Sequence, residues 1–148
     1  MPRILVINGP NLNNLGRRDR SHYGSTTLAD IVAALTERAT ALGLETKFFQ
    51  SNHEGAIVDF LQEEAENAGG VIINAGALTQ VGYSILDALL DSRLPVVEVH
   101  LSNIHAREEF RRHSVIAPYA AGQIAGLGWR GYVYALEYLA EHIAQSPE

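Results

Sequence analysis

The segment LPVVEVHLSNIHAREEFRRHS, residues 94–114, is the best guide to how this chain folds and works. Its first part, residues 95–99, is a β-branched run opened by a proline, which is typical of a buried strand. Glu98 lies inside this apolar run and His100 follows it directly. Residues two apart on a strand point to the same face, and a buried carboxylate needs a partner. We therefore expect Glu98 to pair with His100 and to hold its orientation.

Polar groups continue beyond this strand. Leu101 and Ser102 offer backbone N–H groups and a hydroxyl that could hold an anion at the carboxyl end of the strand. Arg107, Arg111 and Arg112 follow within helical reach, and their guanidinium groups suit carboxylates or hydroxyls. The arginines alone are equally compatible with a solvated turn that carries a charged face.

The composition restricts the classes of function. A chain of 148 residues is long enough for a proper core, and we expect one domain over residues 1–148. A net charge of -6 without a long basic stripe counts against a nucleic-acid partner. The absence of cysteine excludes disulfides, thiolate catalysis and cysteine metal sites. No signal peptide or membrane-spanning run is recognisable, so we expect a cytoplasmic protein without a membrane partner.

Outside residues 94–114, short apolar runs alternate with amphipathic segments. The predicted strands are residues 4–7, 44–50, 71–73, 95–99 and 122–126. The predicted helices begin at Thr26 or Thr27, at the capping-box spacing of Ser51 and Glu54, after Gln80, and at Trp129. This alternation predicts an open parallel α/β sheet whose ligand lies at the carboxyl ends of the strands.

Three of the predicted strands end in polar segments. Residues 8–16, NGPNLNNLG, form a non-repetitive loop with four asparagines, and residues 16–25 extend it into a long polar loop. We expect this extension to be a mobile lid. Residues 74–80 follow the third strand, and His100 ends the fourth. These segments should meet at one edge of the sheet and form one site.

The residues at this edge favour acid–base catalysis. The sequence has no metal-ligand spacing, no G-x-S-x-G serine motif and no Walker phosphate loop. Tyr23 lies five residues after Arg18 in the same loop, and a neighbouring guanidinium favours a phenolate. On the residues alone, Tyr23 could equally be an aromatic side chain that packs the loop down.

Four segments resemble type II 3-dehydroquinate dehydratase. They are NGPNLNNLGRRDRSHYG (8–24), QSNHEG (50–55), INAGALT (73–79) and EVHLSNIHAREEFRRHS (98–114). Their order and the chain length also fit, so the resemblance covers essentially the whole chain. It implies a flavodoxin-like fold, a five-stranded parallel sheet with helices on both faces. The implied reaction is dehydration of 3-dehydroquinate to 3-dehydroshikimate by anti elimination through an enolate, without a cofactor, in the shikimate or quinate pathway.

The resemblance assigns catalytic roles by position. Tyr23 matches the tyrosinate base that takes the proton next to the ketone. Arg18 matches the arginine that favours the ionised tyrosine, and Arg107 is a candidate to assist it. His100, oriented by Glu98, matches the general acid that protonates the departing hydroxyl.

Further positions match substrate-binding groups. Asn11 matches the residue that holds a water against the enolate oxygen, an electrostatic contribution. Asn74 and the backbone at residues 101–102, Leu101 and Ser102, match the groups that bind the substrate carboxylate, and Arg111 matches a ligand of the ring hydroxyls. Asp87 matches an acid that reaches the site of a neighbouring subunit, which implies trimers, in the family usually assembled into a dodecamer.

The chain also departs from the family pattern. Gln80 stands where the family usually has a histidine that contacts substrate hydroxyls, and Gly82 replaces a serine. Since glutamine still donates and accepts hydrogen bonds, we expect weaker binding with the chemistry retained. Two alternatives stay open: a weakened relative that binds a similar hydroxy-acid, and a flavodoxin-like module that binds a nucleotide or flavin. The sole lysine, Lys47, lies in mid-strand, which counts against an imine mechanism.

Overall fold

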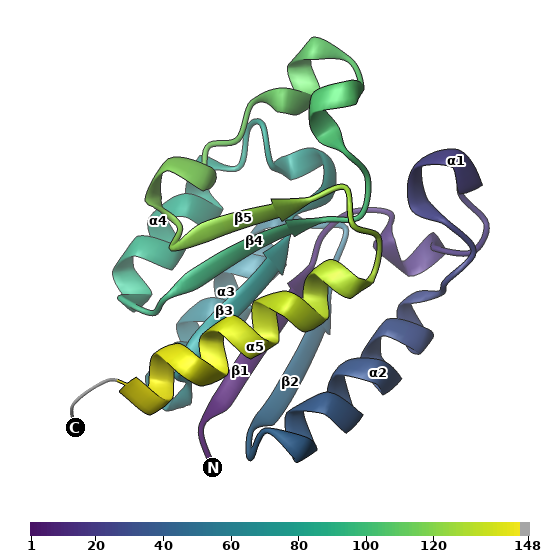
Figure 1. Cartoon of the computed structure of the whole chain (residues 1–148). Helices are drawn as coiled ribbons and strands as arrows, with labels where there is room; N and C mark the ends of the chain where they lie inside the picture. Colours follow the sequence, from purple (N-terminus) through teal and green to yellow (C-terminus); the bar gives the residue numbers. More distant parts are fainter. Residues whose placement is uncertain (146–148) are drawn as a thin grey trace.

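The computed structural model describes residues 1–145, and five parallel strands form its central sheet (Figure 1). The strands are β1 (Arg3–Asn8), β2 (Glu45–Gln50), β3 (Gly70–Asn74), β4 (Val96–His100) and β5 (Gly122–Ala125). Their order is β2-β1-β3-β4-β5, so the chain winds first to one side of β1 and then to the other. This is the expected flavodoxin-like fold, and its topological switch point lies between β1 and β3.

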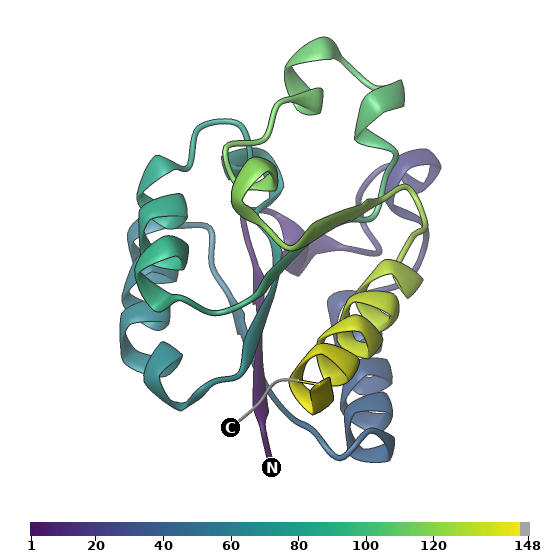
Figure 2. The ribbon, with the colours of Figure 1, turned by 60° about the vertical axis from the view of Figure 1, so that its left-hand side comes forward.

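Helices cover both faces of the sheet. They are α2 (Leu28–Ala41), α3 (Glu54–Glu64), α4 (Tyr83–Ser92) and α5 (Arg130–Gln145), whereas the four-residue helix α1 (Arg20–Tyr23) lies in the loop after β1. The helices α2 and α5 pack on the face that carries Ile4 and Val6, whereas α3 and α4 pack on the face that carries Leu5 and Ile7. Figure 2 shows these two layers on opposite sides of the sheet. Because both faces are covered, β1 is a continuous apolar run rather than an alternating one.

The helix starts show one confirmed prediction and one error. Thr27 caps α2 by accepting a hydrogen bond from the N–H of Asp30, whose carboxylate accepts from the N–H of Thr27 in return. The capping box expected at Ser51 and Glu54 is wrong, because the hydroxyl of Ser51 accepts from the N–H of His53 two residues on. Among residues 1–145, no helix has the length and apolar character needed to cross a membrane.

Gly9 fixes the loop after β1 against the end of β3. Its N–H donates to the carbonyl oxygen of Asn74 at 2.8 Å. A Cβ atom at position 9 would lie 2.4 Å from the carbonyl oxygen of Ala75. Because that oxygen belongs to the backbone, it cannot rotate aside as a side chain would. The loop that carries the asparagines therefore depends on glycine for its close approach to β3.

The substitution Gly9→Ala is expected to lower the free energy of unfolding by about 2 kcal/mol or more, because the methyl group would overlap the backbone of Ala75, directly after β3. Gly55→Ala is the matched control, since a Cβ there has no neighbour within 4 Å and the position lies inside α3. Alanine should stabilise that helix by roughly 0.5–1 kcal/mol. Urea unfolding followed by circular dichroism measures both changes. Wild-type stability in Gly9→Ala would contradict the steric argument.

Candidate active site

A cleft of about 160 Å³ lies at the carboxyl edge of the sheet, beside the switch point. Its walls come from the segments that follow β1, β3 and β4, as the sequence predicted. The lining residues are Pro10, Asn11, Leu12, Arg18, Tyr23, Asn74, Gly76, Ala77, Gln80, His100, Leu101, Ser102, Ile104, Arg107 and Arg111. Every predicted site residue lines this cleft except Glu98, Asp87 and Arg112.

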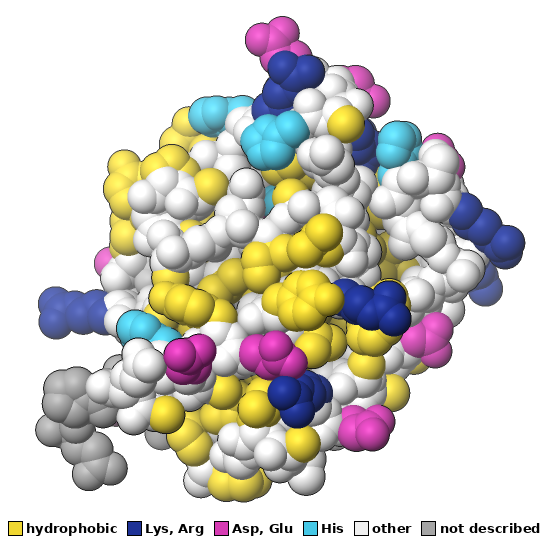
Figure 3. Space-filling model, in the orientation of Figure 1, with side chains coloured by type: hydrophobic (Ala, Val, Ile, Leu, Met, Phe, Trp, Pro, Cys, Tyr) yellow, Lys and Arg dark blue, Asp and Glu magenta, His cyan; other side chains and the backbone are white. Residues whose placement is uncertain are grey.

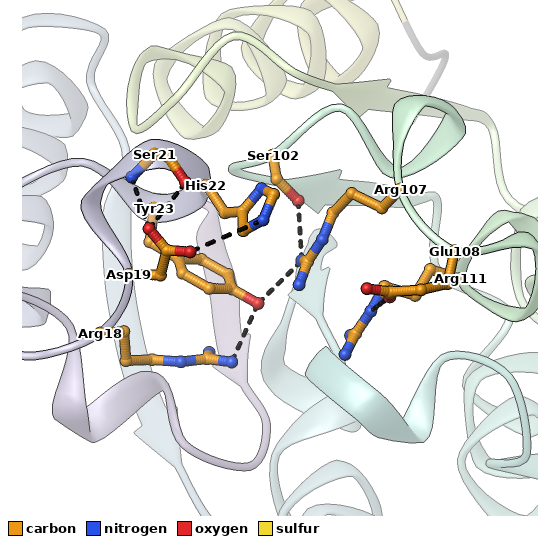
Figure 4. Close-up of polar contacts among 9 residues, drawn as sticks. All are labelled: Arg18, Asp19, Ser21, His22, Tyr23, Ser102, Arg107, Glu108 and Arg111. Carbon is orange, nitrogen blue, oxygen red and sulfur yellow. Dashed lines mark hydrogen bonds and ion pairs between the residues drawn. The ribbon is translucent and has the colours of Figure 1, made fainter.

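The hydroxyl of Tyr23 lies between two guanidinium groups (Figure 4). Arg18 donates to it at 2.9 Å and Arg107 at 2.8 Å. The guanidinium of Arg18 also lies over the tyrosine ring, 3.8 Å from its centroid. Two positive charges beside one oxygen stabilise the negative charge that would develop if the phenol gave up its proton. The arrangement goes beyond the packing of a loop aromatic and suits a base.

The short helix α1 brings Tyr23 to the cleft. Asp19 caps it by accepting from the N–H of Ser21 at 2.9 Å, and His22 lies 3.7 Å from the same carboxylate. Hydrogen bonds from Ser21 hold the pKa of the Asp19 carboxyl below its usual range, which keeps the cap charged. The polar sequence that predicted a loop thus forms one capped turn of helix at its end.

The arginines that follow β4 lie on short turns rather than on one helix. The segment forms separate 3-10 turns at Ile104–Ala106 and Glu109–Arg112. Arg107 and Arg111 consequently face the cleft, and Arg111 donates to Glu108, whereas Arg112 is exposed and does not line the cleft. Arg107 also donates to the hydroxyl of Ser102 at 3.3 Å. Its Nε atom is buried without a hydrogen-bond partner among the described residues.

Glu98 and His100 form the predicted pair. His100 Nε2 lies 2.8 Å from Oε2 of Glu98, and the imidazole lines the cleft while the carboxylate is fully buried behind it. Ser114 and Gln123 also donate to this carboxylate. Burial raises the pKa of Glu98, but the hydrogen bonds from His100, Ser114 and Gln123 outweigh it and hold the pKa below its ordinary value of 4.5. Glu98 is therefore an anion at neutral pH, and it orients the imidazole.

Ser114 and Gln123 are functional neighbours that the sequence reasoning missed. Gln123 lies on β5 directly opposite Glu98 in the strand register. A polar residue in the fifth predicted strand was the available signal, but the pairing of β5 with β4 could not be read from it. Ser114 ends the quoted 94–114 segment and reaches back 16 residues to Glu98.

A second buried network lies beneath the cleft and was also missed. The hydroxyl of Tyr132 donates to Oδ1 of Asn8 at 2.6 Å and accepts from Nδ2 of Asn74 at 3.0 Å. Oδ1 of Asn74 accepts in turn from the N–H of Gly76 at 3.2 Å. Burial raises the pKa of the Tyr132 hydroxyl, although the bond from Asn74 lowers it, so the group stays a neutral donor.

Asp87 and Gln80 differ in their relation to the cleft. Gln80 is half-buried and lines it, at the position where the family pattern has histidine. Asp87 is exposed on α4 and does not line the cleft of its own chain. Through Gln145, no group of three or more histidine or acidic side chains is placed to hold a metal ion.

A flavodoxin-like sheet that carries, at one edge, a tyrosine between two guanidiniums and a Glu–His pair has the groups that acid–base catalysis uses. A family model described as "Dehydroquinase class II" matches residues 2–140. The 3-dehydroquinate dehydratase of Roseiflexus castenholzii is 58% identical over 145 residues, which cover 98% of this chain and 92% of that protein. The chain belongs to the class II dehydroquinase family, the type II 3-dehydroquinate dehydratases, which are hydro-lyases.

A solved structure and a further relative agree with this assignment. The crystal structure of a type II dehydroquinase from Propionibacterium acnes has a TM-score of 0.91 at 44% identity, covering 95% of this chain and 97% of that one. A protein of Verticillium alfalfae named catabolic 3-dehydroquinase is 52% identical over 141 residues, covering 95% of this chain and 94% of that protein. The chain is therefore similar both to a relative whose name specifies a catabolic enzyme and to relatives whose names give only the reaction.

Proposed function

We propose that this chain converts 3-dehydroquinate to 3-dehydroshikimate by anti elimination of water through an enolate, in the shikimate or quinate pathway. The observation that carries the proposal is the hydroxyl of Tyr23, held by Arg18 at 2.9 Å and by Arg107 at 2.8 Å. A base at this oxygen and an acid at His100 line the same cleft. The two groups can therefore act on one substrate, as elimination requires.

In the proposed reaction, the Tyr23 phenolate removes the proton next to the ketone. The electron pair of that C–H bond moves to the carbonyl oxygen and forms the enolate, against which Asn11 holds a water molecule. The enolate then re-forms the ketone as the C–O bond to the hydroxyl breaks, and a proton from His100 lets the hydroxyl leave as water. Tyr23 ends with the extra proton and His100 without one, so one net proton returns from the tyrosine to the histidine.

Other lining residues suit the carboxylate and hydroxyls of such a substrate. Asn74 is held rigidly by Tyr132, and Nδ2 of an amide has a second hydrogen to offer. Ser102 and Arg111 lie on the same cleft. The side chain of Arg107 also lines the cleft, and its buried Nε atom has no hydrogen-bond partner among the described residues. These donors favour an anionic, hydroxylated ligand.

Turnover of 3-dehydroquinate by the purified chain tests the proposal directly. The conjugated product absorbs in the ultraviolet, so its formation can be followed continuously. A folded protein without turnover would overturn the proposal and favour the weakened relative that Gln80 suggested. Activity gained in Gln80→His would then identify that residue as the cause.

We also propose that the chain assembles into trimers, and these into a dodecamer, with Asp87 reaching the cleft of a neighbouring copy. Leu90, three residues after Asp87 on α4, and Tyr119 are exposed beside a cavity of about 150 Å³ lined mostly by apolar residues. Figure 3 shows a second gathering of hydrophobic side chains, across β5 and α5. Light scattering should give three or twelve times the 16.1 kDa of one chain, and a monomer would contradict the assembly. The lid at residues 16–25, the single catalytic domain and the cytoplasmic location stay predictions.

A further inference from the structure

The buried carboxylate of Glu98 receives hydrogen bonds on both of its oxygens. Ser114 Oγ lies 2.5 Å from Oε1. Gln123 Nε2 and His100 Nε2 both contact Oε2, the latter at 2.8 Å. Two of these three groups, Ser114 and Gln123, lie outside the cleft and cannot touch the substrate.

The hydroxyl of Ser114 has a fixed hydrogen-bond direction. Its oxygen accepts from the backbone N–H of Ile116 at 3.1 Å and from that of Ala117 at 2.9 Å. A hydroxyl has two acceptor lone pairs and one proton, and here both lone pairs are used. The proton of Ser114 must therefore point to Oε1 of Glu98. A proton on Oε1 would face that proton head-on.

The other oxygen is equally closed to protonation. The amide nitrogen of Gln123, on the neighbouring strand β5, directs a hydrogen at Oε2. An oxygen that already accepts from this amide can take the proton of His100 Nε2 as a second hydrogen bond. If Oε2 carried a proton of its own, it would lose one of these two hydrogen bonds.

We propose that Ser114 and Gln123 are positioning residues that hold Glu98 as a carboxylate, so that Nε2 of His100 is always the donor. Nδ1 is then the only ring nitrogen that remains for the substrate. The inference deepens the proposed function, on which it rests, because it states which atom of His100 delivers the proton to the departing hydroxyl.

The charges around His100 explain why a charged Glu98 matters for catalysis. Arg18, Tyr23, Arg107 and Arg111 lie on the cleft side, whereas Asn74, Gln123 and Tyr132, on the adjoining strands and on α5, are neutral. Three guanidiniums line the cleft on one side of the imidazole, and the Glu98 carboxylate behind it is the anion that offsets their positive charge. Without the hydrogen bonds from Ser114 and Gln123, the buried Glu98 would take up a proton more readily. It would then no longer carry the negative charge that offsets the guanidiniums.

Neutron crystallography of the wild-type protein at pH 7 tests the placement of the protons. We expect deuterium on Ser114 Oγ, directed at Oε1, and on His100 Nε2, with none on Glu98. Deuterium on either oxygen of Glu98 would overturn the proposal. The experiment needs no turnover, so it stands apart from the test of the proposed reaction.

The pH dependence of stability tests whether Gln123 and Ser114 keep Glu98 ionised. A carboxyl whose pKa is lowered on folding stabilises the protein above its unfolded pKa, and this stability is lost as the pH falls through the folded pKa. Gln123→Met should therefore lower the melting temperature by about 5 °C at pH 7 and by progressively less below about pH 4.5. In a Glu98→Gln background the effect of Gln123→Met should no longer depend on pH.

Matched variants separate this role from ordinary packing. Ser114→Ala should behave as Gln123→Met does, with an added constant loss from the turn at Ile116 and Ala117. Ser114→Thr keeps the hydroxyl, and Gln62→Met replaces an exposed glutamine on α3, so neither should show the pH-dependent difference. A decrease in melting temperature that is the same at pH 4 and pH 7 in Gln123→Met would overturn the proposal. That variant keeps the turn intact and is the decisive one.

Discussion

Replacement of Tyr23 by phenylalanine is expected to lower turnover of 3-dehydroquinate by roughly 10²–10⁴-fold, the usual contribution of a general base. Phenylalanine keeps the ring that packs under Arg18 and removes only the oxygen held by the two guanidiniums. The loss should fall on kcat, because the oxygen acts on the proton being transferred rather than on substrate binding. Ultraviolet detection of the conjugated product measures it.

Two comparisons make the Tyr23→Phe result specific. Tyr134→Phe removes a hydroxyl from an exposed tyrosine of α5 that does not line the cleft, and its turnover should match the wild type. The melting temperature of Tyr23→Phe should also stay close to that of the wild type, since the hydroxyl is only partly buried. If Tyr23→Phe retained more than about a tenth of the activity, a general base at this position would be ruled out.

Local sequence patterns predicted those parts of the fold that depend on neighbouring residues in the chain. The apolar run over residues 71–73 predicted β3 because a parallel strand covered on both faces needs apolar side chains throughout. Strand β2 was harder to recognise, because it pairs only with β1 and lies at the edge of the sheet, where Glu45 and Lys47 are exposed. Local patterns did not predict the order of the strands, β2-β1-β3-β4-β5, since nothing in a strand's own sequence specifies its neighbours.

The site was predictable where its groups are close in sequence. Glu98 with His100, and Arg18 with Tyr23, are two and five residues apart, and both pairs form. Arg107 reaches Tyr23 across 84 residues, a contact that depends on how the chain returns to the cleft.

Local polar residues also misled the sequence reasoning. Ser51 has the spacing of a helix cap, but its hydroxyl bonds an N–H two residues away instead. A short polar side chain has several nearby backbone groups to choose from, and spacing alone does not say which one it takes.

The second large effect is expected at the two arginines that hold Tyr23. Arg18→Met and Arg107→Met should each lower kcat by about 10²-fold, since each removes a charged donor from the oxygen that becomes negative. Methionine keeps an unbranched side chain of similar length, so packing changes little. Arg112→Met is the control, because Arg112 is exposed and off the cleft and should be dispensable.

The same arginine changes in the Tyr23→Phe background show how the arginines act. If both guanidiniums act through the oxygen of Tyr23, the Tyr23→Phe protein has already lost their contribution to kcat. Arg18→Met or Arg107→Met should then cost less than about threefold there, far below the product of the single effects. An equal loss in both backgrounds would mean that the arginines act on the substrate directly, with Tyr23 as a separate contributor. The distances of 2.9 and 2.8 Å to one hydroxyl favour the first outcome, because neither arginine has a closer hydrogen-bond partner among the described residues than that oxygen.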